Sequence, residues 1–441
     1  MPERRRLLAV SVIGAACLGA QVLAGTAATA ADEVVSRGVT IPAFYNPPTT
    51  LPAADGTLVR TEPLKLALSL PSLNGPLPGR ATRLMYKSTD SSGSPVAVTG
   101  AYIEPSAAWK GEGPRPLVAL APGTMGQGDQ CAASMGLEHP LRLNGETVSV
   151  GYEDLAIYRL LATGTAVVVT DYAGLGATDR LHTYVNRVDE AHALLDAARA
   201  ARKVGGASVT AESRVGLFGY SQGGGASAAA AELQPSYAPD VNLAGTYAGA
   251  PPADLTEVTR AIDGSELAGA LGWSLNGFLQ SDPALKPIAE AHLNTAGKAA
   301  LADLSTMCVG DALFGYGGAE STDWTTDGRS VSDIIAATPA LTSFLNSQRI
   351  GTLKPTTPVR VATGVSDDLV PHAQARRLAT DWCAKGANVT YDPVLLPNTG
   401  SPLLNHFTPL LADQGDAVDW LTDRLKGRSA HSNCWSMPLQ P

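Results

Sequence analysis

Residues 214–233 read Arg-Val-Gly-Leu-Phe-Gly-Tyr-Ser-Gln-Gly-Gly-Gly-Ala-Ser-Ala-Ala-Ala-Ala-Glu-Leu. The apolar run at 215–218 predicts a buried strand, and the alanine-rich run at 226–233 predicts a helix. Between them, residues 219–223 match the pattern Gly-x-Ser-x-Gly, in which a serine sits on a sharp strand-to-helix turn with its hydroxyl exposed. Ser221 is therefore the predicted nucleophile.

The glycine pattern alone is weak evidence, because this chain has 45 glycines among its 441 residues. Its setting is more informative, since a strand before the serine and a helix after it are what the pattern requires. The N-terminal end of that helix would also stabilise a developing oxyanion. We therefore favour a nucleophile turn over an ordinary glycine-rich turn.

The order of predicted elements indicates an α/β fold. Strands are predicted first at 83–87, 96–103 and 117–120, and we expect them to form the antiparallel part of the sheet. From residue 166 onward, strands alternate with helices, which is typical of a mostly parallel sheet covered by helices on both faces. The later strands are predicted at 166–169, 215–218, 243–248, 359–362 and 389–396.

The alternation stops after residue 248 and resumes at 359. Apolar side chains at helical spacing, including Leu267 and Leu271, predict helices in this insertion. Its place after the nucleophile favours a helical cap over an ordinary subdomain. The predicted domains are an extended N-terminal arm (31–75), the first part of the core (76–250), the cap (251–355) and the second part of the core (356–441).

The N-terminus has the pattern of a secretory signal peptide. Arg4, Arg5 and Arg6 precede a largely apolar stretch, and a small-x-small site ends at Ala30. Small residues dilute the apolar stretch, which argues against an uncleaved membrane anchor. We therefore expect residues 1–30 to be removed and the mature protein to be secreted.

Cleavage would change the formal net charge from −9 to −11, because three arginines and one glutamate leave with the peptide. An acidic exported protein is a poor candidate for nucleic-acid binding. The sequence has no second apolar segment long enough for stable membrane insertion.

Four cysteines remain in the mature chain, an even number in an oxidising compartment: Cys131, Cys308, Cys383 and Cys434. Two disulfides are the natural interpretation, and the spacing alone permits three pairings. No two of these cysteines have the spacing of a zinc-finger pair, so we expect no metal site. We also expect no cofactor.

A serine nucleophile needs a general base that is oriented by a carboxylate, and in α/β hydrolases both follow the serine in the chain. Asp367 and Asp368 come just beyond the predicted strand 359–362, at the end of the sheet where such sites gather. The two adjacent carboxylates are not distinguished by this argument. Asp367 is preferred on the family motif described below.

Four histidines follow the serine: His292, His372, His406 and His431. His406 lies after the last predicted strand and before a helix predicted from residue 408, where a base can reach the nucleophile turn. His372 is the main competitor, but it is too close to the acid in sequence to be its separate partner. His406 is therefore the predicted base.

An oxyanion hole requires two backbone donors. Gln222 follows the nucleophile and supplies the first. The glycine-rich turn at 121–128 follows a predicted strand, so Thr124 or Met125 is the expected second donor.

These motifs together resemble the secretory lipase family of fungi and actinobacteria. The likeness rests on the segment 121–132, the turn at 219–223, the pattern Gly364-x-x-Asp367-x-x-Val370-Pro371, and His406. It implies an α/β-hydrolase fold with a helical cap, and Ser221, Asp367 and His406 as nucleophile, orienting acid and base. It also implies that Cys131 pairs with Cys308, and Cys383 with Cys434.

The predicted function is a secreted serine hydrolase that cleaves carboxylic esters through an acyl-enzyme. The resemblance implies a triacylglycerol lipase whose substrate is an acylglycerol or another lipophilic ester, with transient contact at lipid interfaces. The alternatives are a short-chain carboxylesterase acting on acetylated small molecules, a serine peptidase, and a non-catalytic secreted binding protein. The three triad residue types in the required order argue against the last alternative.

Overall fold

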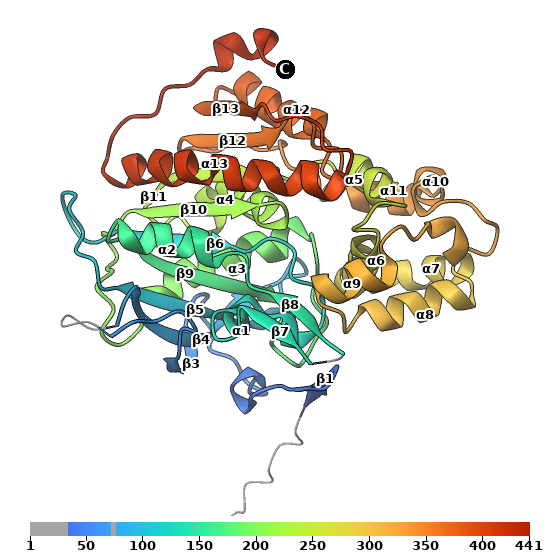
Figure 1. Cartoon of the computed structure of the whole chain (residues 1–441), viewed down its shortest axis with the longest axis horizontal. Coiled ribbons are helices and arrows are strands. Elements are labelled where there is room, and N and C mark those ends of the chain that lie inside the picture. Colours follow the sequence, from blue (N-terminus) through green and yellow to red (C-terminus); the bar gives the residue numbers. More distant parts are fainter. Residues whose placement is uncertain (1–33, 72–75, 145) are drawn as a thin grey trace, which may run out of the picture. The chain divides into compact units, whose positions relative to one another are not determined.

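The computed structural model describes residues 34–71, 76–144 and 146–441 (Figure 1). The predicted signal peptide at 1–30 lies outside the described residues. None of the helices in the described ranges combines the length and the hydrophobicity that a membrane-spanning helix needs.

The central sheet contains nine strands of the described chain. From β13 to β9 all neighbouring strands are parallel, and β5, β4 and β3 continue the sheet in antiparallel pairs. The predicted α/β architecture with a mostly parallel sheet is confirmed. In spatial order the strands are β13 (Val389–Val394), β12 (Val359–Gly364), β11 (Leu243–Gly249), β10 (Val215–Tyr220), β6 (Leu117–Ala121), β9 (Ala166–Ala173), β5 (Pro95–Pro105), β4 (Gly79–Thr89) and β3 (Leu58–Leu64).

Helices cover both faces of this sheet, as alternate residues of β6 show. Leu117 and Ala119 belong to an apolar cluster with α3 (Arg187–Ala201), α4 (Gln222–Tyr237) and α12 (His372–Ala384). Val118 and Leu120 belong to the opposite cluster, with α2 (Asp154–Ala162) and α13 (Pro402–Leu425). The central strands are therefore buried on both sides, which explains why they read as continuous apolar runs.

Two expectations about the first part of the sheet were wrong. Strand β6 is parallel to both of its neighbours, β9 and β10, because helical crossovers through α2 and α3 connect these strands. The predicted arm at 31–75 is not wholly an arm, since β3 is an edge strand paired with β4. Pro63 is tolerated in β3 because an edge strand has a free side. The earlier described part of the arm contains β1 (Val35–Ser36), β2 (Val39–Thr40) and the short helix η1 (Ala43–Tyr45).

Pro393 predicted an edge position or a bulge for its strand. The structure confirms the edge position, because β13 is the last strand on that side of the sheet and pairs only with β12.

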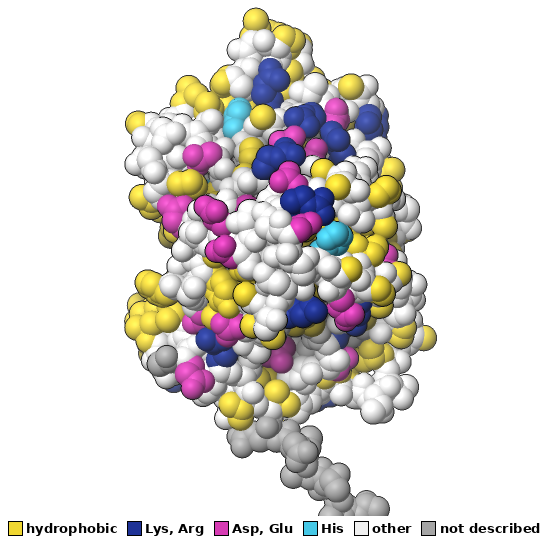
Figure 2. Space-filling view, turned by 90° about the vertical axis from the view of Figure 1, so that its right-hand side faces the viewer, with side chains coloured by type: hydrophobic (Ala, Val, Ile, Leu, Met, Phe, Trp, Pro, Cys, Tyr) yellow, Lys and Arg dark blue, Asp and Glu magenta, His cyan; other side chains and the backbone are white. Residues whose placement is uncertain are grey.

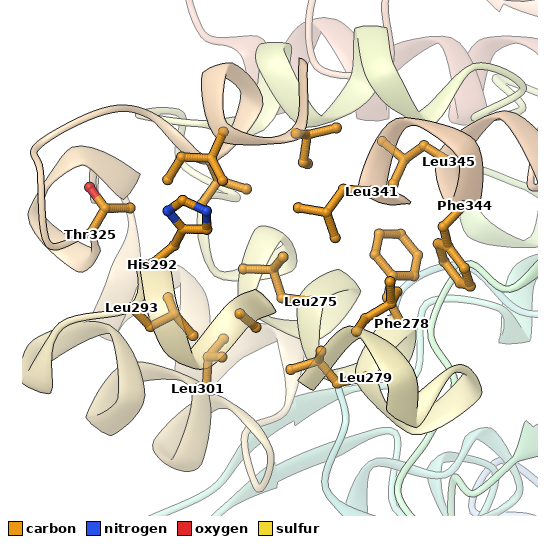
Figure 3. A pocket seen from close by; sticks show the side chains of 15 residues that line it. Leu275, Phe278, Leu279, His292, Leu293, Leu301, Thr325, Leu341, Phe344 and Leu345 are labelled. Carbon is orange, nitrogen blue, oxygen red and sulfur yellow. The ribbon is translucent and has the colours of Figure 1, made fainter. Parts of the chain in front are cut away.

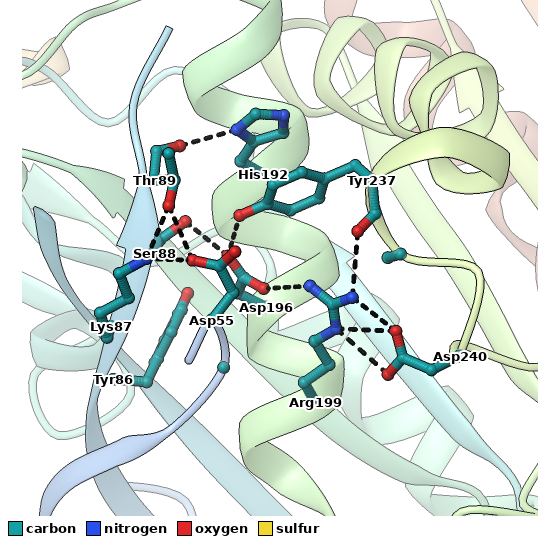
Figure 4. A network of polar contacts seen from close by, with 12 residues as sticks. Asp55, Tyr86, Lys87, Ser88, Thr89, His192, Asp196, Arg199, Tyr237 and Asp240 are labelled. Carbon is teal, nitrogen blue, oxygen red and sulfur yellow. Dashed lines mark hydrogen bonds and ion pairs between the residues drawn. The ribbon is translucent and has the colours of Figure 1, made fainter. Parts of the chain in front are cut away.

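Asp196 of α3 is the centre of a buried polar network that fastens this helix to the core (Figure 4). It accepts hydrogen bonds from Ser88 (2.7 Å), Tyr237 (2.6 Å) and Arg199 (3.0 Å). Burial raises the pKa of Asp196 to about 6, while these bonds lower it. The network joins α3 to β4 and α4, so this perturbed carboxylate has a structural explanation.

The insertion between β11 and β12 is helical, and its helices lie on one side of the sheet (Figure 1). Leu271, Trp273 and Leu304 are fully or almost fully buried in its own apolar cluster. Its elements are α5 (Leu255–Ile262), α6 (Gly269–Ser281), η3 (Pro283–Leu285), α7 (Lys286–His292), α8 (Thr295–Leu304), α9 (Val309–Tyr316), η4 (Ser321–Trp324), α10 (Val331–Ala337) and α11 (Pro339–Ser347). We refer to this insertion as the cap.

Figure 2 views the molecule from the side that carries the cap. Acidic and basic side chains are interspersed on this face, with small apolar areas between them. The face therefore lacks the continuous basic field that binds a nucleic-acid backbone.

Smaller elements precede α2. They are η2 (Asp129–Cys131), α1 (Ala133–Gly136) and the hairpin of β7 (Leu141–Leu143) and β8 (Val148–Val150). Two of them, η2 and β8, contact the cap through Gln130–Thr306 and Val148–Asp311 hydrogen bonds. Backbone hydrogen bonds join this region to the cap, from Val309 to Met125 (2.8 Å) and from Gln127 to Met307 (2.9 Å).

The structure contains the two disulfides that the resemblance implies. Cys131–Cys308 connects the segment after β6 with the cap, and Cys383–Cys434 connects α12 with the C-terminal helix η5 (Cys434–Leu439). Their sequence separations are 177 and 51 residues.

Removing the first bridge with the double variant Cys131→Ser/Cys308→Ser should lower thermal stability. A bridge that closes so long a loop restricts the unfolded chain, and the chain-entropy model gives about 5 kcal/mol as an upper value. The backbone bonds at Met125 and Gln127 remain, so we expect a folded protein with a lower melting temperature. Calorimetry checks this, and an unchanged transition would contradict the assigned stabilising role.

Candidate active site

Ser221 occupies the sharp turn between β10 and α4. Its φ of 59° and ψ of −125° are strained for a residue with a side chain, as expected at a nucleophile turn. The flanking glycines are required by space. A Cβ at Gly219 would lie 2.1 Å from the carbonyl oxygen of Gly223, and a Cβ at Gly223 would lie 2.0 Å from that of Ala121.

The structure brings the three predicted triad residues together. His406 lies between the other two, with Nε2 2.8 Å from Ser221 Oγ and Nδ1 2.7 Å from Asp367 Oδ2. An ionised Asp367 accepts the Nδ1 proton, which leaves the Nε2 lone pair facing the serine hydroxyl. This is the protonation pattern that a general base requires.

Asp367, and not Asp368, points at His406. Oδ1 of Asp367 accepts hydrogen bonds from the backbone N–H groups of Leu369 (3.2 Å) and Val370 (3.0 Å), and the residue is 3% exposed. Asp368 is exposed, and its carboxylate accepts only a 3.3 Å hydrogen bond from Asn405 among the described contacts. The geometry therefore distinguishes two neighbours that residue spacing did not.

The segment carrying His406 differs from the prediction. The helix was expected from residue 408, but α13 begins at Pro402 and His406 lies within it. Ser401 caps the helix by accepting a hydrogen bond from Leu404 N (3.3 Å), and proline fits the first helical position. Tyr220 donates a 2.7 Å hydrogen bond to the carbonyl of His406, which fixes the helix to the end of β10.

The other histidines lie elsewhere. His372 begins α12, with Nε2 3.1 Å from the Tyr391 hydroxyl. His292 ends α7 in the cap, and His431 is exposed in the C-terminal segment.

The glycine-rich turn after β6 lies beside the nucleophile turn, since the carbonyl oxygens of Ala121 and Pro122 approach Gly223. Thr124 is held at two points. Its carbonyl accepts a 2.9 Å hydrogen bond from Tyr152, and its hydroxyl is 2.7 Å from that of Tyr184. Met125 is buried and paired with the cap through its carbonyl. Gln222 begins α4 on the other side of Ser221. The oxyanion roles of Gln222, Thr124 and Met125 stay predictions.

Two buried glutamates at the site were not found from the sequence. Glu153 accepts a 2.7 Å hydrogen bond from Gly123 N, and Glu190 accepts one of 2.8 Å from the Gln222 side chain. Burial raises their pKa values to about 7 and about 8, respectively. The sequence did contain a signal for Glu190, because it lies four residues before Leu194 and therefore on the same face of a helix.

Ser221 and Gln222 line a narrow cavity between the core and the cap. Its other walls are largely apolar. They are formed by Tyr184, Val185, Pro252, Leu255, Val258, Thr259, Ile262, Leu267, Ala270, Ser274, Phe278, Leu369 and Val370.

A second narrow cavity lies within the cap (Figure 3). Leucine and phenylalanine side chains from α6, α8 and α11 converge on it, and His292 and Thr325 are its polar members. Phe278 lines both cavities, and its ring lies 5.0 Å from that of Phe344, measured between centroids.

In the part of the chain that the structure describes, no group of three or more His, Cys, Asp or Glu side chains is arranged to hold a metal ion.

A sequence model described as secretory lipase matches residues 137–433, a range that includes Ser221, Asp367 and His406. The chain belongs to the secretory lipase family. The resemblance inferred from the sequence is confirmed.

Relatives in this family carry different names. A Mycobacterium tuberculosis protein named as a probable inactive lipase is 30% identical over 388 residues, covering 87% of this chain and 82% of the relative. Lipase 4 of Candida albicans is 26% identical, covering 80% and 74%. A secreted triacylglycerol lipase of Malassezia globosa is 27% identical, covering 71% and 64%.

Solved structures confirm the α/β-hydrolase fold. The closed state of Candida antarctica lipase A matches with a TM-score of 0.74 at 20% identity, covering 89% of this chain and 87% of that one. The rice cell wall degrading esterase LipA of Xanthomonas oryzae matches with a TM-score of 0.67 at 20% identity, covering 85% and 100%. At this identity the likeness concerns the fold alone.

Proposed function

We propose that this protein is a secreted carboxylic ester hydrolase of the triacylglycerol lipase type, with Ser221, His406 and Asp367 as its catalytic residues. One observation carries the proposal: a hydrogen-bonded line from Asp367 through His406 to Ser221 ends at the wall of a largely apolar cavity. The family name and the two disulfides support an extracellular location.

In the proposed mechanism, Ser221 Oγ attacks the ester carbonyl carbon while His406 Nε2 accepts the hydroxyl proton. Backbone N–H groups of Gln222 and of Thr124 or Met125 stabilise the oxyanion. Asp367 stabilises the imidazolium, which then gives its proton to the leaving alcohol as the acyl-enzyme forms. Water, activated by the same histidine, attacks the acyl-enzyme and regenerates Ser221.

The apolar cavities beside and within the cap are evidence for a lipophilic substrate. An acyl chain esterified to Ser221 would begin in the first cavity, and the second cavity could receive its distal part beyond Phe278. Burying each CH₂ of the chain stabilises the complex by about 0.8 kcal/mol, so apolar walls favour long acyl groups.

A short-chain carboxylesterase is the second candidate, and the position of Phe278 favours it. If this ring stays between the two cavities, only the cavity beside Ser221 receives the acyl group. Long-chain hydrolysis would then be slow.

Hydrolysis of a chromogenic ester series from acetate to palmitate tests both functions, with Ser221→Ala as the control. A kcat/KM that rises with chain length supports the lipase, and one that falls beyond butyrate supports the esterase. An absence of turnover on every ester would contradict both and favour a binding protein.

Filling the cap cavity should shorten the preferred acyl chain. Leu345 is 3% exposed and lines this cavity (Figure 3), so Leu345→Trp should displace at least two CH₂ groups of a long chain. At about 0.8 kcal/mol for each, kcat/KM for long-chain esters should fall about tenfold, with little change for acetate.

Phe314→Trp is the matched control, because Phe314 is 83% exposed on the cap. Equal losses on acetate and palmitate in Leu345→Trp, or none on either, would show that the acyl chain does not enter this cavity.

A further inference from the structure

Glu190 of α3 holds two parts of the candidate site with one carboxylate oxygen. Its Oε1 accepts a 2.9 Å hydrogen bond from Val185 N and a 2.8 Å hydrogen bond from Gln222 Nε2. The residue is 2% exposed, so water does not compete for these donors. Glu190 thereby connects a wall of the cavity with the first residue of the helix after the nucleophile.

The backbone of Val185 needs such support. Its φ is 57°, which is an outlier for a β-branched residue and persists only where the surroundings hold it. Val185 and its neighbour Tyr184 line the cavity beside Ser221. The Tyr184 hydroxyl also contacts Thr124, in the turn on the other side of the nucleophile.

His182 completes the fixation of the Gln222 side chain. Burial lowers the pKa of His182 to about 4, so the ring is neutral near pH 7. Its Nδ1 lies 3.0 Å from the Ala173 carbonyl and therefore carries the proton, which leaves Nε2 as an acceptor 3.1 Å from Gln222 Nε2. Both amide hydrogens of Gln222 thus have a buried acceptor.

We propose that Glu190 is a positioning residue for ester hydrolysis, which fixes the Gln222 oxyanion donor and the Val185 wall of the acyl site. The proposal rests on the function proposed above. Glu190 acts through Gln222 and Val185 and does not contact the reacting atoms. Its loss should therefore weaken stabilisation of the tetrahedral oxyanion more than binding of the ester.

Two substitutions test whether Glu190 acts as a hydrogen-bond acceptor or through a negative charge. Because burial raises the pKa of Glu190 to about 8, glutamine is close in shape and charge to the neutral carboxyl group near pH 7. Glu190→Gln retains a carbonyl that accepts from Val185 and Gln222. Glu190→Leu has a similar volume and no acceptor.

A sample of each variant is first titrated with a phosphonate ester to count its reactive serines. The kcat of the unlabelled enzyme is then expressed per reactive serine. Losing one oxyanion donor outright costs about 10² to 10³ in kcat, and misplacing one should cost Glu190→Leu about ten- to a hundredfold. We expect KM for a butyrate ester to change little and the affinity for an alkylboronic acid, which forms a tetrahedral adduct, to fall with kcat. Glu190→Gln should recover most of the activity.

Glu232→Leu is the control for losing a buried glutamate, because Glu232 of α4 accepts hydrogen bonds from Gly351 N, Leu353 N, Trp382 and Arg187, none of which lines the cavity beside Ser221. It should lower thermal stability without changing kcat per reactive serine. If Glu190→Leu does not fold, Gln222→Leu tests the same link, since it retains the backbone N–H and loses only the anchored amide.

A normal kcat in Glu190→Leu or Gln222→Leu would overturn the proposal, as would an equal loss in Glu190→Gln. These outcomes require an active wild-type protein. A wild type that neither reacts with the phosphonate nor cleaves esters would instead contradict the proposed function.

Discussion

Replacement of Ser221 with alanine is expected to lower kcat for ester hydrolysis by about a millionfold, as in other hydrolases that lose the nucleophile of a triad. Without Oγ, His406 has no hydroxyl to deprotonate and no acyl-enzyme forms. The residual rate would come from the oxyanion hole and substrate binding. Hydrolysis of a chromogenic butyrate ester, compared with the uncatalysed rate, measures the loss.

Ser227→Ala is the matched control, because it removes a hydroxyl from the same helix. Ser227 is fully buried in α4, and its Oγ has no hydrogen-bond partner among the described residues. Its activity and melting temperature should therefore stay close to the wild-type values. Turnover in Ser221→Ala above about one percent of the wild-type value would exclude this serine as the nucleophile.

One relative is named as a probable inactive lipase, so membership in the family does not by itself establish activity, and this measurement is needed. Membership in the family describes the fold and the ancestry of the chain, and activity depends on the geometry of the site. Here His406 lies within hydrogen-bond distance of both Ser221 and Asp367. This supports an active enzyme, and an inactive wild type would contradict the proposed function while leaving the fold unchanged.

The fold was predictable where local pattern and topology agree. Strand β10 and helix α4 flank Ser221 as the glycine pattern requires, because a tight strand-to-helix turn leaves no space for Cβ atoms at Gly219 and Gly223. The late strands were also predictable, since burial on both faces demands continuous apolar runs.

Features set by contacts between distant residues were not predictable in the same way. Whether β6 pairs in a parallel or an antiparallel way depends on which strands are its neighbours, and the apolar sequence Leu117–Ala121 is compatible with both. The sequence shows that Glu190 is a charged residue on an apolar helix face. It does not show that the partners are Val185 and Gln222, because these contacts depend on how α3 packs against its neighbours. The start of α13 was missed although Ser401-Pro402 is a local signal for a helix N-terminus.

The adjacent carboxylates Asp367 and Asp368 give the second large effect. Asp367→Asn is expected to lower kcat about ten-thousandfold. The N–H groups of Leu369 and Val370 require an oxygen at the Oδ1 position, so the new amide nitrogen must take the place of Oδ2 and face His406. It would then donate to Nδ1 and move the histidine proton to Nε2, where the ring no longer accepts the Ser221 proton.

Asp368→Asn should retain activity within about threefold, because its exposed carboxylate only accepts a long hydrogen bond from Asn405 and is screened by solvent. The two variants change neighbouring residues by the same atoms, so a general effect of mutating this turn would appear in both. Kinetics on one ester, with kcat expressed per phosphonate-reactive serine, compare them directly. Only the carboxylate 2.7 Å from His406 Nδ1 can set the histidine tautomer in this structure, so equal losses in the two variants would contradict the role assigned to Asp367.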